Sequence, residues 1–533
     1  TAFNSTVNAD RLITHATGTL TVEGTVTTTT AVDFKDETTL TLGDGIVAGE
    51  TVFLATQAGS AIDGSCAGAA MTLNLPQGFN SGSITLIDYD GATTGAADAA
   101  LLKLVSGVLA TYTAGVGDDS SKVDITAVKK SSATIAAALG VTASAARGLD
   151  QMSTVAAGNT ALLDILSTVL NAGGAAATQL AEQVQGSPDG LGATSGAATA
   201  SAGAAVVSVG SSRMAALRTG NAYASTAYFT PTLAQNTTQL GTGFNAGSGA
   251  QSNSMWMKPF ASFGDQGLRA GVKGYEADTY GLAVGGDTRL NAHSIAGLSF
   301  SYADTDVDGK GAGRSHSDIK SYQLTAYADY TEKDFYVEGL VGYAHNDMDT
   351  SRDITVTNVK AKGDTKSGQY MVSVNAGMPM KAEGLPGAYF TPTLGLNITH
   401  VANKEYTETG AGVLNLKVNP EDITIVKASL GGRLHTNVED SDGIFVPELR
   451  AKLLYDMAGD DGSSSNTFTG GGAAFQVEGM DVAEFATSVG VGFAFAPKGI
   501  EDLDGMSFSV NYDAEFKEDF TGQSGNFNLR YAF

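Results

Sequence analysis

The stretch 485–495 reads FATSVGVGFAF, and its regular alternation of bulky and small residues decides the fold class. Successive side chains of a β-strand point to opposite faces, so every second residue shares a face. One face is then bulky and apolar except at Thr487, while the other carries only Ala, Ser and Gly. The bulky positions are Phe485, Val489, Val491, Phe493 and Phe495.

The same split recurs in 507–516 and 526–533, where aromatic and aliphatic residues alternate with polar ones up to the final Phe533. In 445–455 one face carries Glu448, Arg450 and Lys452, opposite a mostly apolar face. Charges on one face and aromatic rings on the other predict a wet lumen inside a wall that faces lipid. A soluble β-sandwich or β-barrel, the alternative, would turn its large residues inward and its polar ones outward.

About twelve such segments follow one another between 255 and 533, each near the roughly 9–11 residues that a tilted strand needs to cross a bilayer. An even number closes an antiparallel barrel, which leaves no open edge in lipid. Long connections, which include 304–317, 346–365, 402–421 and 456–480, alternate with mostly shorter ones. Since long loops face outward and short turns face the periplasm, both barrel ends are predicted on the periplasmic side. A segment preceding the barrel then reaches the surface only through the lumen.

Composition excludes several other classes of protein. The net charge of -25 argues against nucleic acid as a partner, because phosphate binding needs clustered Lys and Arg. No stretch approaches the ~18–20 uninterrupted apolar residues of a spanning helix, so membrane insertion is predicted to be by barrel alone. The chain begins at Thr1 without a basic and apolar secretion signal, and we expect a mature or truncated product.

The region before the barrel divides into three parts. Residues 1–130 contain short Thr- and Val-rich segments between Gly and Asp turns, which predict the end of a β-solenoid. Residues 131–190 are Ala-rich and predict two or three short helices, with Ser131 and Asn159 as N-caps. Residues 191–254 form a Gly/Ser/Ala/Thr-rich linker that contains one short helical pattern, at 204–218.

The carboxyl-terminal part resembles the autotransporters, or type V secretion proteins. The resemblance covers 255–533 and rests on 256–260 (WMKPF), 263–265 (FGD), Gly274-Tyr275, 280–287 with its Gly-Gly-Asp, and the terminal Tyr-Ala-Phe. It implies a twelve-stranded barrel plugged by an α-helix, here 204–218 with Arg213, Met214, Leu217 and Arg218. It also implies that residues 1–130 are the end of a β-helical passenger. The terminal residues Phe527, Leu529, Tyr531 and Phe533 look like the signal that the outer-membrane assembly machinery reads.

Some members of this family cut their own passenger free at a pair of Asn residues on the plug helix. The matching positions here are Ser208 and Val209, which lack the reacting side-chain amide. We therefore expect no self-cleavage by that route.

Chemical motifs are sparse. Asp304-x-Asp306-x-Asp308-Gly309 begins like a calcium loop, but Ser315 stands where a bidentate Glu is needed, which favours an acidic hairpin tip. The six His residues show no zinc-binding spacing. We expect no catalytic, cofactor or metal site, and no enzyme. Arg433 and Lys452 are predicted to line the lumen, where either contact with the plug helix or simple solvation accounts for them.

These observations predict an outer-membrane translocator and anchor that exports its own passenger and displays it at the cell surface as an adhesin-like or structural layer. The expected partners are outer-membrane lipid, the barrel assembly machinery and a ligand on a host or neighbouring cell. Two alternatives stay open: a porin-like channel whose N-terminal region stays periplasmic, and the anchor of a hydrolytic passenger lost upstream.

Overall fold

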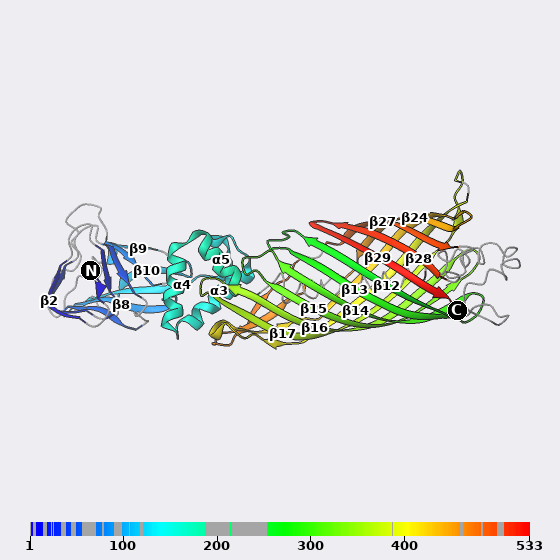
Figure 1. The fold of residues 1–533 in the computed structure, drawn as a ribbon. Coiled ribbons are helices and arrows are strands. Elements are labelled where there is room, and N and C mark those ends of the chain that lie inside the picture. Colours follow the sequence, from blue (N-terminus) through cyan, green and yellow to red (C-terminus); the bar gives the residue numbers. More distant parts are fainter. Residues whose placement is uncertain are drawn as a thin grey trace.

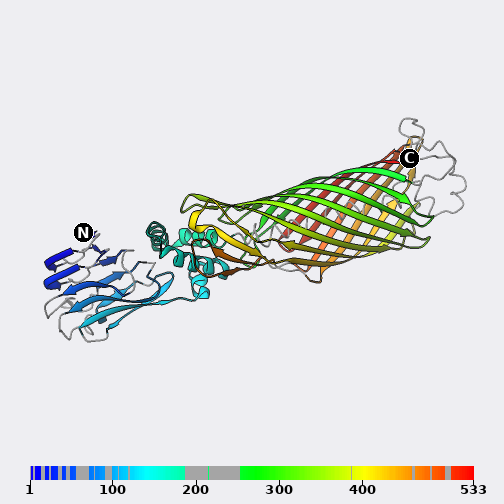
Figure 2. The same ribbon diagram turned by 90° about the horizontal axis from the view of Figure 1, so that it is seen from below.

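The structure is a computed structural model of the 533-residue chain. It describes residues 2–3, 7–13, 19–22, 24, 26–33, 39–43, 49–55, 71–76, 79–89, 99–105, 107–117, 121–186, 214, 253–385, 387–458, 462–480, 483–497 and 506–532. Three units follow one another in a row: a solenoid, a helical segment and a barrel (Figure 1). The carboxyl terminus lies at the end of the barrel remote from the other two units (Figures 1 and 2).

The barrel is a closed ring of twelve antiparallel strands. Closure comes from pairing of the first strand, β12, with the last, β29, so the wall has no open edge. The ring consists of β12 (Asn253–Gln266), β13 (Tyr275–Arg289), β14 (Ser294–Gly309), β15 (His316–Thr331), β16 (Tyr336–Ile354), β17 (Val359–Gly377), β19 (Ala388–Asn403), β22 (Ile423–Thr436), β24 (Gly443–Asp456), β27 (Phe485–Pro497), β28 (Met506–Lys517) and β29 (Phe520–Ala532). Two short strands, β18 (Met380–Lys381) and β23 (Val438–Glu439), extend hairpins of this sheet.

The strands are longer than a membrane crossing requires, which corrects the sequence-based prediction of long loops at 304–317 and 346–365. Strands β16 and β17 have 19 residues each and are joined only by 355–358. Above the membrane the ladder continues, because Val307, Ile319 and Met348 fill the inside with apolar side chains while outward positions become charged. Paired backbone groups are satisfied with or without lipid.

The outward face shows where the membrane lies. Aromatic rings meet across neighbouring strands toward the long-hairpin end, as in Tyr302–Tyr322 at 5.3 Å and Tyr343–Tyr370 at 5.1 Å. A second set lies toward the short-turn end, as in Tyr330–Phe335 at 6.3 Å. Between the two sets the exposed wall is aliphatic, which is the pattern of an apolar band between aromatic girdles. The outward positions of 485–495 follow the predicted face, with Phe485, Val489 and Val491 exposed.

Two connections at the long-hairpin end fold into a small sheet that we call the loop sheet. It comprises β20 (Tyr406–Thr407), β21 (Leu416–Pro420), β25 (Ser464–Phe468) and β26 (Phe475–Val477). A 3-10 turn, η3 (Gly412–Leu414), precedes β21. The connections predicted as loops at 402–421 and 456–480 therefore contain the four strands of this sheet.

The helical segment, 131–186, has four helices rather than the two or three predicted: α2 (Ser132–Leu139), α3 (Ala143–Ala156), α4 (Thr160–Ala172) and α5 (Gly174–Val184). The Ser131 and Asn159 side chains accept hydrogen bonds from the amides of Thr134 and Leu162, as N-caps do. A further cap, Thr142, begins α3 directly after Gly140 ends α2 with a φ of 66°. None of the described helices is long and apolar enough to span a membrane.

The solenoid has two sheets of parallel strands. One is β1 (Ala2–Phe3), β3 (Thr19–Val22), β5 (Thr39–Leu42), β7 (Met71–Asn74) and β9 (Leu102–Leu104); the other contains β2 (Val7–Ile13), β4 (Val26–Asp33), β6 (Thr51–Ala55) and β8 (Gly82–Tyr89). Alternate Leu, Val and Ile side chains from both sheets fill one core. Strand β11 (Lys122–Lys129) then pairs antiparallel with β8, and β10 (Ala110–Val116) pairs antiparallel with β11, which closes that end of the solenoid.

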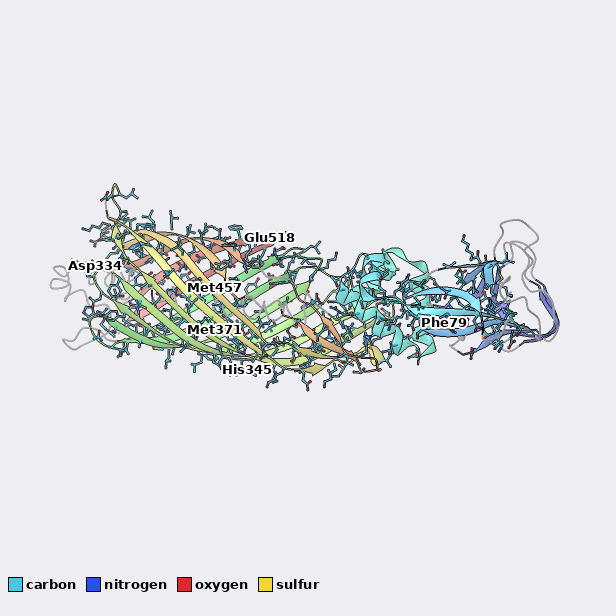
Figure 3. The ribbon with its side chains drawn as sticks, turned by 180° about the vertical axis from the view of Figure 1, so that it is seen from behind. Phe79, Asp334, His345, Met371, Met457 and Glu518 are labelled. Carbon is cyan, nitrogen blue, oxygen red and sulfur yellow. The ribbon has the colours of Figure 1, made fainter. Side chains whose placement is uncertain are left out.

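Side chains mark the order of the units along the molecule. Asp334 lies at the short-turn end of the barrel, and Phe79 lies in the solenoid beyond the helical segment (Figure 3). The helical segment therefore stands at the long-hairpin end of the barrel, which we call the mouth. The Gln185 carbonyl accepts a hydrogen bond from Asn466 of the loop sheet, so the helical segment ends at the mouth. The barrel begins at the opposite end, where Asn253 pairs with Thr288 beside the short turn 290–293.

Candidate functional site: the barrel lumen and its mouth

The first barrel strands carry aromatic rings that lie flat on inward-facing glycines. A Cβ built on Gly285 would stand 2.5 Å from the Trp256 ring, and one built on Gly281 would stand 2.2 Å from the Phe260 ring. The Trp256 Nε1–H donates to the Tyr327 hydroxyl at 2.8 Å, and that hydroxyl donates to Asp287 Oδ2 at 3.0 Å. The residues that carry the family resemblance thus meet each other on the lumen wall.

Met214 is a described residue of the linker between the helical segment and the barrel. It is helical and fully buried, and it belongs to a cluster of inward-facing residues from β12 to β16. That cluster is Met214, Trp256, Phe260, Ala283, Ala303, Tyr327 and Leu340. Because 186 lies at the mouth and 253 at the other end, the chain passes through the lumen at Met214. The other predicted plug residues, Arg213, Leu217 and Arg218, and the positions Ser208 and Val209 lie outside the described residues.

Replacing Gly285 by Ala is expected to destabilise the barrel by about 1–3 kcal/mol, the usual cost of overpacking. The new Cβ would stand 2.5 Å from the Trp256 ring and 2.8 Å from the carbonyl oxygen of Leu298, which its strand holds in place. Gly286→Ala is the matched control, because its nearest contact is an ordinary 3.5 Å to the Ser254 carbonyl. The measurement is the temperature at which each purified barrel loses its heat-modifiable mobility. Equal temperatures for the two variants would contradict the close approach.

A charged cluster lies on the opposite side of the lumen. Glu448, on β24, forms ion pairs with Arg433 from β22 and with Arg450 two residues along its own strand. Arg450 also binds Asp513 on β28, with Nη2 3.0 Å from Oδ2 and Nε 3.1 Å from Oδ1. Arg433 and Glu448 are therefore mutual partners in a cross-strand network. Lys452 occupies the next inward position of β24 and is exposed to the lumen.

The carboxyl-terminal residues alternate as the sequence predicts. Phe527 is exposed on the outward face and Leu529, two residues on, lies on the same face and is half-buried. Tyr531 pairs with Met506 within the ladder. Phe533 lies outside the described residues.

The mouth holds a buried ion pair that sequence reasoning missed. Arg352, near the end of β16, binds Glu408 through two hydrogen bonds, Nε to Oε1 at 2.8 Å and Nη2 to Oε2 at 2.7 Å. Both side chains are only 1% exposed. The Leu416 amide donates to Glu408 at 2.7 Å, so the carboxylate also holds β21. Burial, and then the Glu408 charge, raise the pKa of nearby Tyr406 and keep its hydroxyl neutral.

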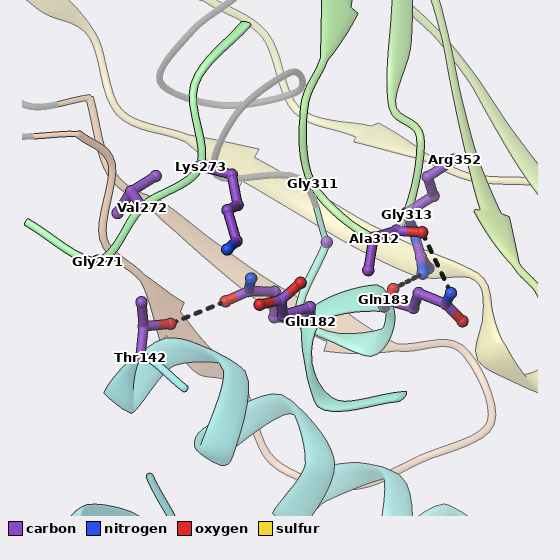
Figure 4. Close-up of a pocket in the computed structure, with 12 residues that line it drawn as sticks. Thr142, Glu182, Gln183, Gly271, Val272, Lys273, Gly311, Ala312, Gly313 and Arg352 are labelled. Atoms are coloured by element: carbon purple, nitrogen blue, oxygen red, sulfur yellow. Dashed lines mark hydrogen bonds between the residues drawn. The ribbon is translucent and has the colours of Figure 1, made fainter. Parts of the chain in front are cut away.

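Arg352 also joins the barrel to the helical segment. Its Nη1 donates to the Gln183 carbonyl, in the last turn of α5, at 2.7 Å. The Gln183 side chain in turn donates to the Ala312 carbonyl at 3.2 Å (Figure 4). It also accepts from the Thr355 amide at 3.0 Å. A cation at the carboxyl-terminal turn of a helix also interacts favourably with the helix dipole.

Two aspartates and one histidine on the outward face near the mouth lie close together. Ligand atoms of Asp306, Asp308 and His316 all fall within 4.8 Å of one another. The acidic residues are on β14 and not at a hairpin tip as predicted, since the tip is 310–315. Burial alone would lower the pKa of His316, but its hydrogen bond to Asp308 and the charges of Asp306 and Asp318 outweigh this and raise it. These groups lie beyond the Tyr302–Tyr322 girdle, outside the membrane.

Asp308→Asn is expected to lower the pKa of His316 toward its ordinary value of about 6.5, because it removes a hydrogen-bonded anion. A raised His pKa favours the folded state below pH ~6.5, and this contribution is lost as the pH rises through the raised value. The measurement is the NMR titration of the imidazole C–H signal, assigned with His316→Gln. Asp265→Asn is the control, because Asp265 pairs with Lys310 instead. A His316 titration unchanged by Asp308→Asn would contradict the contact.

Comparisons with known proteins agree on the barrel. Residues 255–513 match the family described as autotransporter β-domain. Outer membrane protein A of Rickettsia conorii is 25% identical over 289 residues, covering 52% of this chain and 14% of that protein. An extracellular serine protease of Serratia marcescens is 27% identical over 191 residues, covering 35% of this chain and 18% of that protein. The chain thus spans less than a fifth of the length of either relative.

Among solved structures, the translocator domain of the autotransporter NalP from Neisseria meningitidis is 16% identical, with a TM-score of 0.43 and coverage of 53% of this chain and 89% of that one. The family match, the closed twelve-stranded ring and the aromatic girdles place the barrel in the bacterial outer membrane. The carboxyl-terminal barrel is therefore a member of the autotransporter β-domain family.

Proposed function

We propose that this chain anchors residues 1–186 on the outer surface of the bacterium after they have passed through its own barrel. The observation that carries the proposal is the path of the chain. The helical segment stands at the mouth, the barrel begins at the opposite end, and Met214 lies in the lumen between them. With short turns facing the periplasm, the mouth is the extracellular end.

We further propose that the displayed part acts by binding or as a structural surface layer rather than by catalysis. The matched β-domain is of a kind that is generally not enzymatic. The relative from Rickettsia conorii is named an outer membrane protein, which fits a protein retained at the surface. The proposed partners are outer-membrane lipid along the apolar band, the assembly machinery that reads the terminal strand, and a ligand on a host or neighbouring cell.

Protease treatment of intact cells tests this topology. Mass spectrometry is expected to find released peptides from 1–186, including cleavage at the exposed Lys103, while the barrel remains as a heat-modifiable fragment. Cells opened with lysozyme and EDTA serve as the control, because they release these peptides whatever their location. Release from opened cells only would place 1–186 in the periplasm and support the porin-like alternative.

A further inference from the structure

The barrel closes along a seam between its first and last strands, β12 and β29 (Figure 1). The ladder of the seam pairs Met257 with Leu529 and resumes at Phe260 with Asn526, so it skips two positions of each strand. One of the skipped residues is Pro259, which has no N–H to donate. Both strands pair without a break on their other sides, β12 with β13 and β29 with β28. The break therefore belongs to the seam, and the missing N–H of Pro259 is on the side of β29.

The missing hydrogen bond lies in the lipid band. Pro259 is exposed on the outward face, and so is Phe527, which stands opposite it by register. Apolar outward residues continue on both sides, with Met257 toward the short-turn end and Phe263 toward the mouth. Phe263 meets Tyr280 at 5.7 Å in the mouth-side girdle. Because hydrocarbon offers no water to replace a backbone donor, the seam is weakest at this level.

A buried polar atom weakens the same level from the lumen side. Asn528 faces inward beside the break and is 2% exposed. Its Oδ1 atom has no hydrogen-bond partner among the residues that the structure describes. A buried acceptor without a donor destabilises the closed state, so the backbone and a side chain disfavour closure at one point.

The break divides the seam into two unequal halves. The half toward the short-turn end, which we call the short-turn half, consists of four consecutive pairs between 254–257 and 529–532. The half toward the mouth, which we call the mouth half, consists of seven pairs between 260–266 and 520–526. The short-turn half also lies where β12 begins and β29 ends, so no hairpin joins its two strands.

Contacts beyond the ladder hold the mouth half closed. The Asp519 carbonyl accepts hydrogen bonds from the Gly267 amide at 2.6 Å and from the Gln266 side chain at 3.0 Å. Arg269 forms an ion pair with Glu518 at 2.7 Å. Opening the seam therefore costs least in the short-turn half.

We propose that the short-turn half opens and recloses as a unit while the mouth half stays paired, and that Pro259 sets the boundary between them. Opening separates Trp256 from its register partner Arg530. Since Trp256 packs in one cluster with Met214, the lumen gains a side opening toward lipid at that point. Pro259 is a positioning residue, because it acts through the pairing of its neighbours. The inference concerns the barrel wall and does not depend on where 1–186 lie.

Hydrogen exchange of the full chain in lipid discs tests the proposal. Hydrogen-bonded pairs alternate along an antiparallel ladder, so the amides of Met257 and Leu529 report on the short-turn half. The amides of Phe263 and Gln523 report on the mouth half and should exchange more slowly. Pro259→Val supplies the missing N–H. It is expected to slow exchange at Met257 and Leu529 about tenfold, as one added backbone hydrogen bond can, and to leave the mouth half unchanged.

The matched control is Pro447→Val. Pro447 stands at a similar break between β22 and β24, where the ladder pairs His435 with Glu448 and resumes at Val438 with Phe445. An N–H added there should leave exchange in the seam unchanged. Heat-modifiable mobility shows that each variant has folded.

Two disulfide locks then separate the halves, in a chain whose single cysteine is removed by Cys66→Ser. Hydrogen-bonded pairs stand about 5.5 Å apart at Cα, within reach of a disulfide. Oxidised Met257→Cys with Leu529→Cys should suppress exchange in the short-turn half. Ala261→Cys with Gly525→Cys locks the mouth half instead and should leave the short-turn half as fast as before.

Three results would overturn the proposal. The first is equal exchange in the two halves of the wild-type seam, and the second is exchange that Pro259→Val does not slow. The third is slower exchange in the short-turn half when only the mouth half is locked, because the seam would then open as one piece.

Discussion

Replacing Glu408 by Ala is expected to destabilise the docked mouth by about 3–5 kcal/mol, because the Arg352 guanidinium would be left buried without its counter-charge. Glu408 accepts three hydrogen bonds of 2.7 to 2.8 Å, two from Arg352 and one from the Leu416 amide. The measurement is the urea concentration at which trypsin begins to cleave the full chain at Arg147 in α3, whose side chain is held by Glu478.

Two further variants separate the pair from its surroundings. Asp353→Ala removes the partly exposed ion pair with Lys360 and should cost only about 0–1 kcal/mol. The double variant Arg352→Met with Glu408→Leu replaces both charges by apolar groups and should recover most of the loss. If the double variant lost as much stability as the single variants Arg352→Met and Glu408→Leu lose together, the two charges would not be coupled.

Leu298→Arg is expected to destabilise the barrel in lipid by about 2–4 kcal/mol, since it puts a charge on the outward face between the two girdles. Leu298 is 60% exposed on the outer wall and pairs with Ala326, midway between Tyr322 and Tyr330. The measurement is urea unfolding of the chain in lipid vesicles, followed by the fluorescence of Trp256, the chain's single tryptophan.

The matched control for that charge is Ser351→Arg. Ser351 also faces outward but pairs with His316, beyond the girdle, where an added Arg should cost about 0–1 kcal/mol. If the two variants were equally destabilised, the band around Leu298 would not face lipid.

The pattern of single residues in the sequence is enough to predict the wall. Period-two alternation in 485–495 identifies the lipid face, because a strand's faces are set by its own residues. The N-caps Ser131 and Asn159 are predictable for the same reason, since a cap binds an amide three residues away. The helix count was wrong because the short link at Gly140 and Thr142 is a weak break in an Ala-rich pattern.

The contacts that make the site were decided by tertiary structure. Arg352 and Glu408 are 56 residues apart, and Asn466 meets Gln185 across 281 residues. Arg352 occupies an inward position of β16 beyond the girdle, and this was the one signal in the sequence that it has a buried partner. The alternation of residues does not show which residue that partner is. The extension of β16 and β17 above the membrane could not be predicted either. Charged residues at their outward positions resemble a loop when the pattern sought is that of a lipid-facing strand.

The sequence by itself thus determined the outer-membrane barrel and the direction of its strands, because burial in lipid imposes a strong local alternation on every strand. Only the tertiary structure decided which inward residues meet, that His316 joins Asp306 and Asp308, and that the helical segment and the mouth share one core. Such contacts depend on strand register and ring closure, which no local stretch of residues contains.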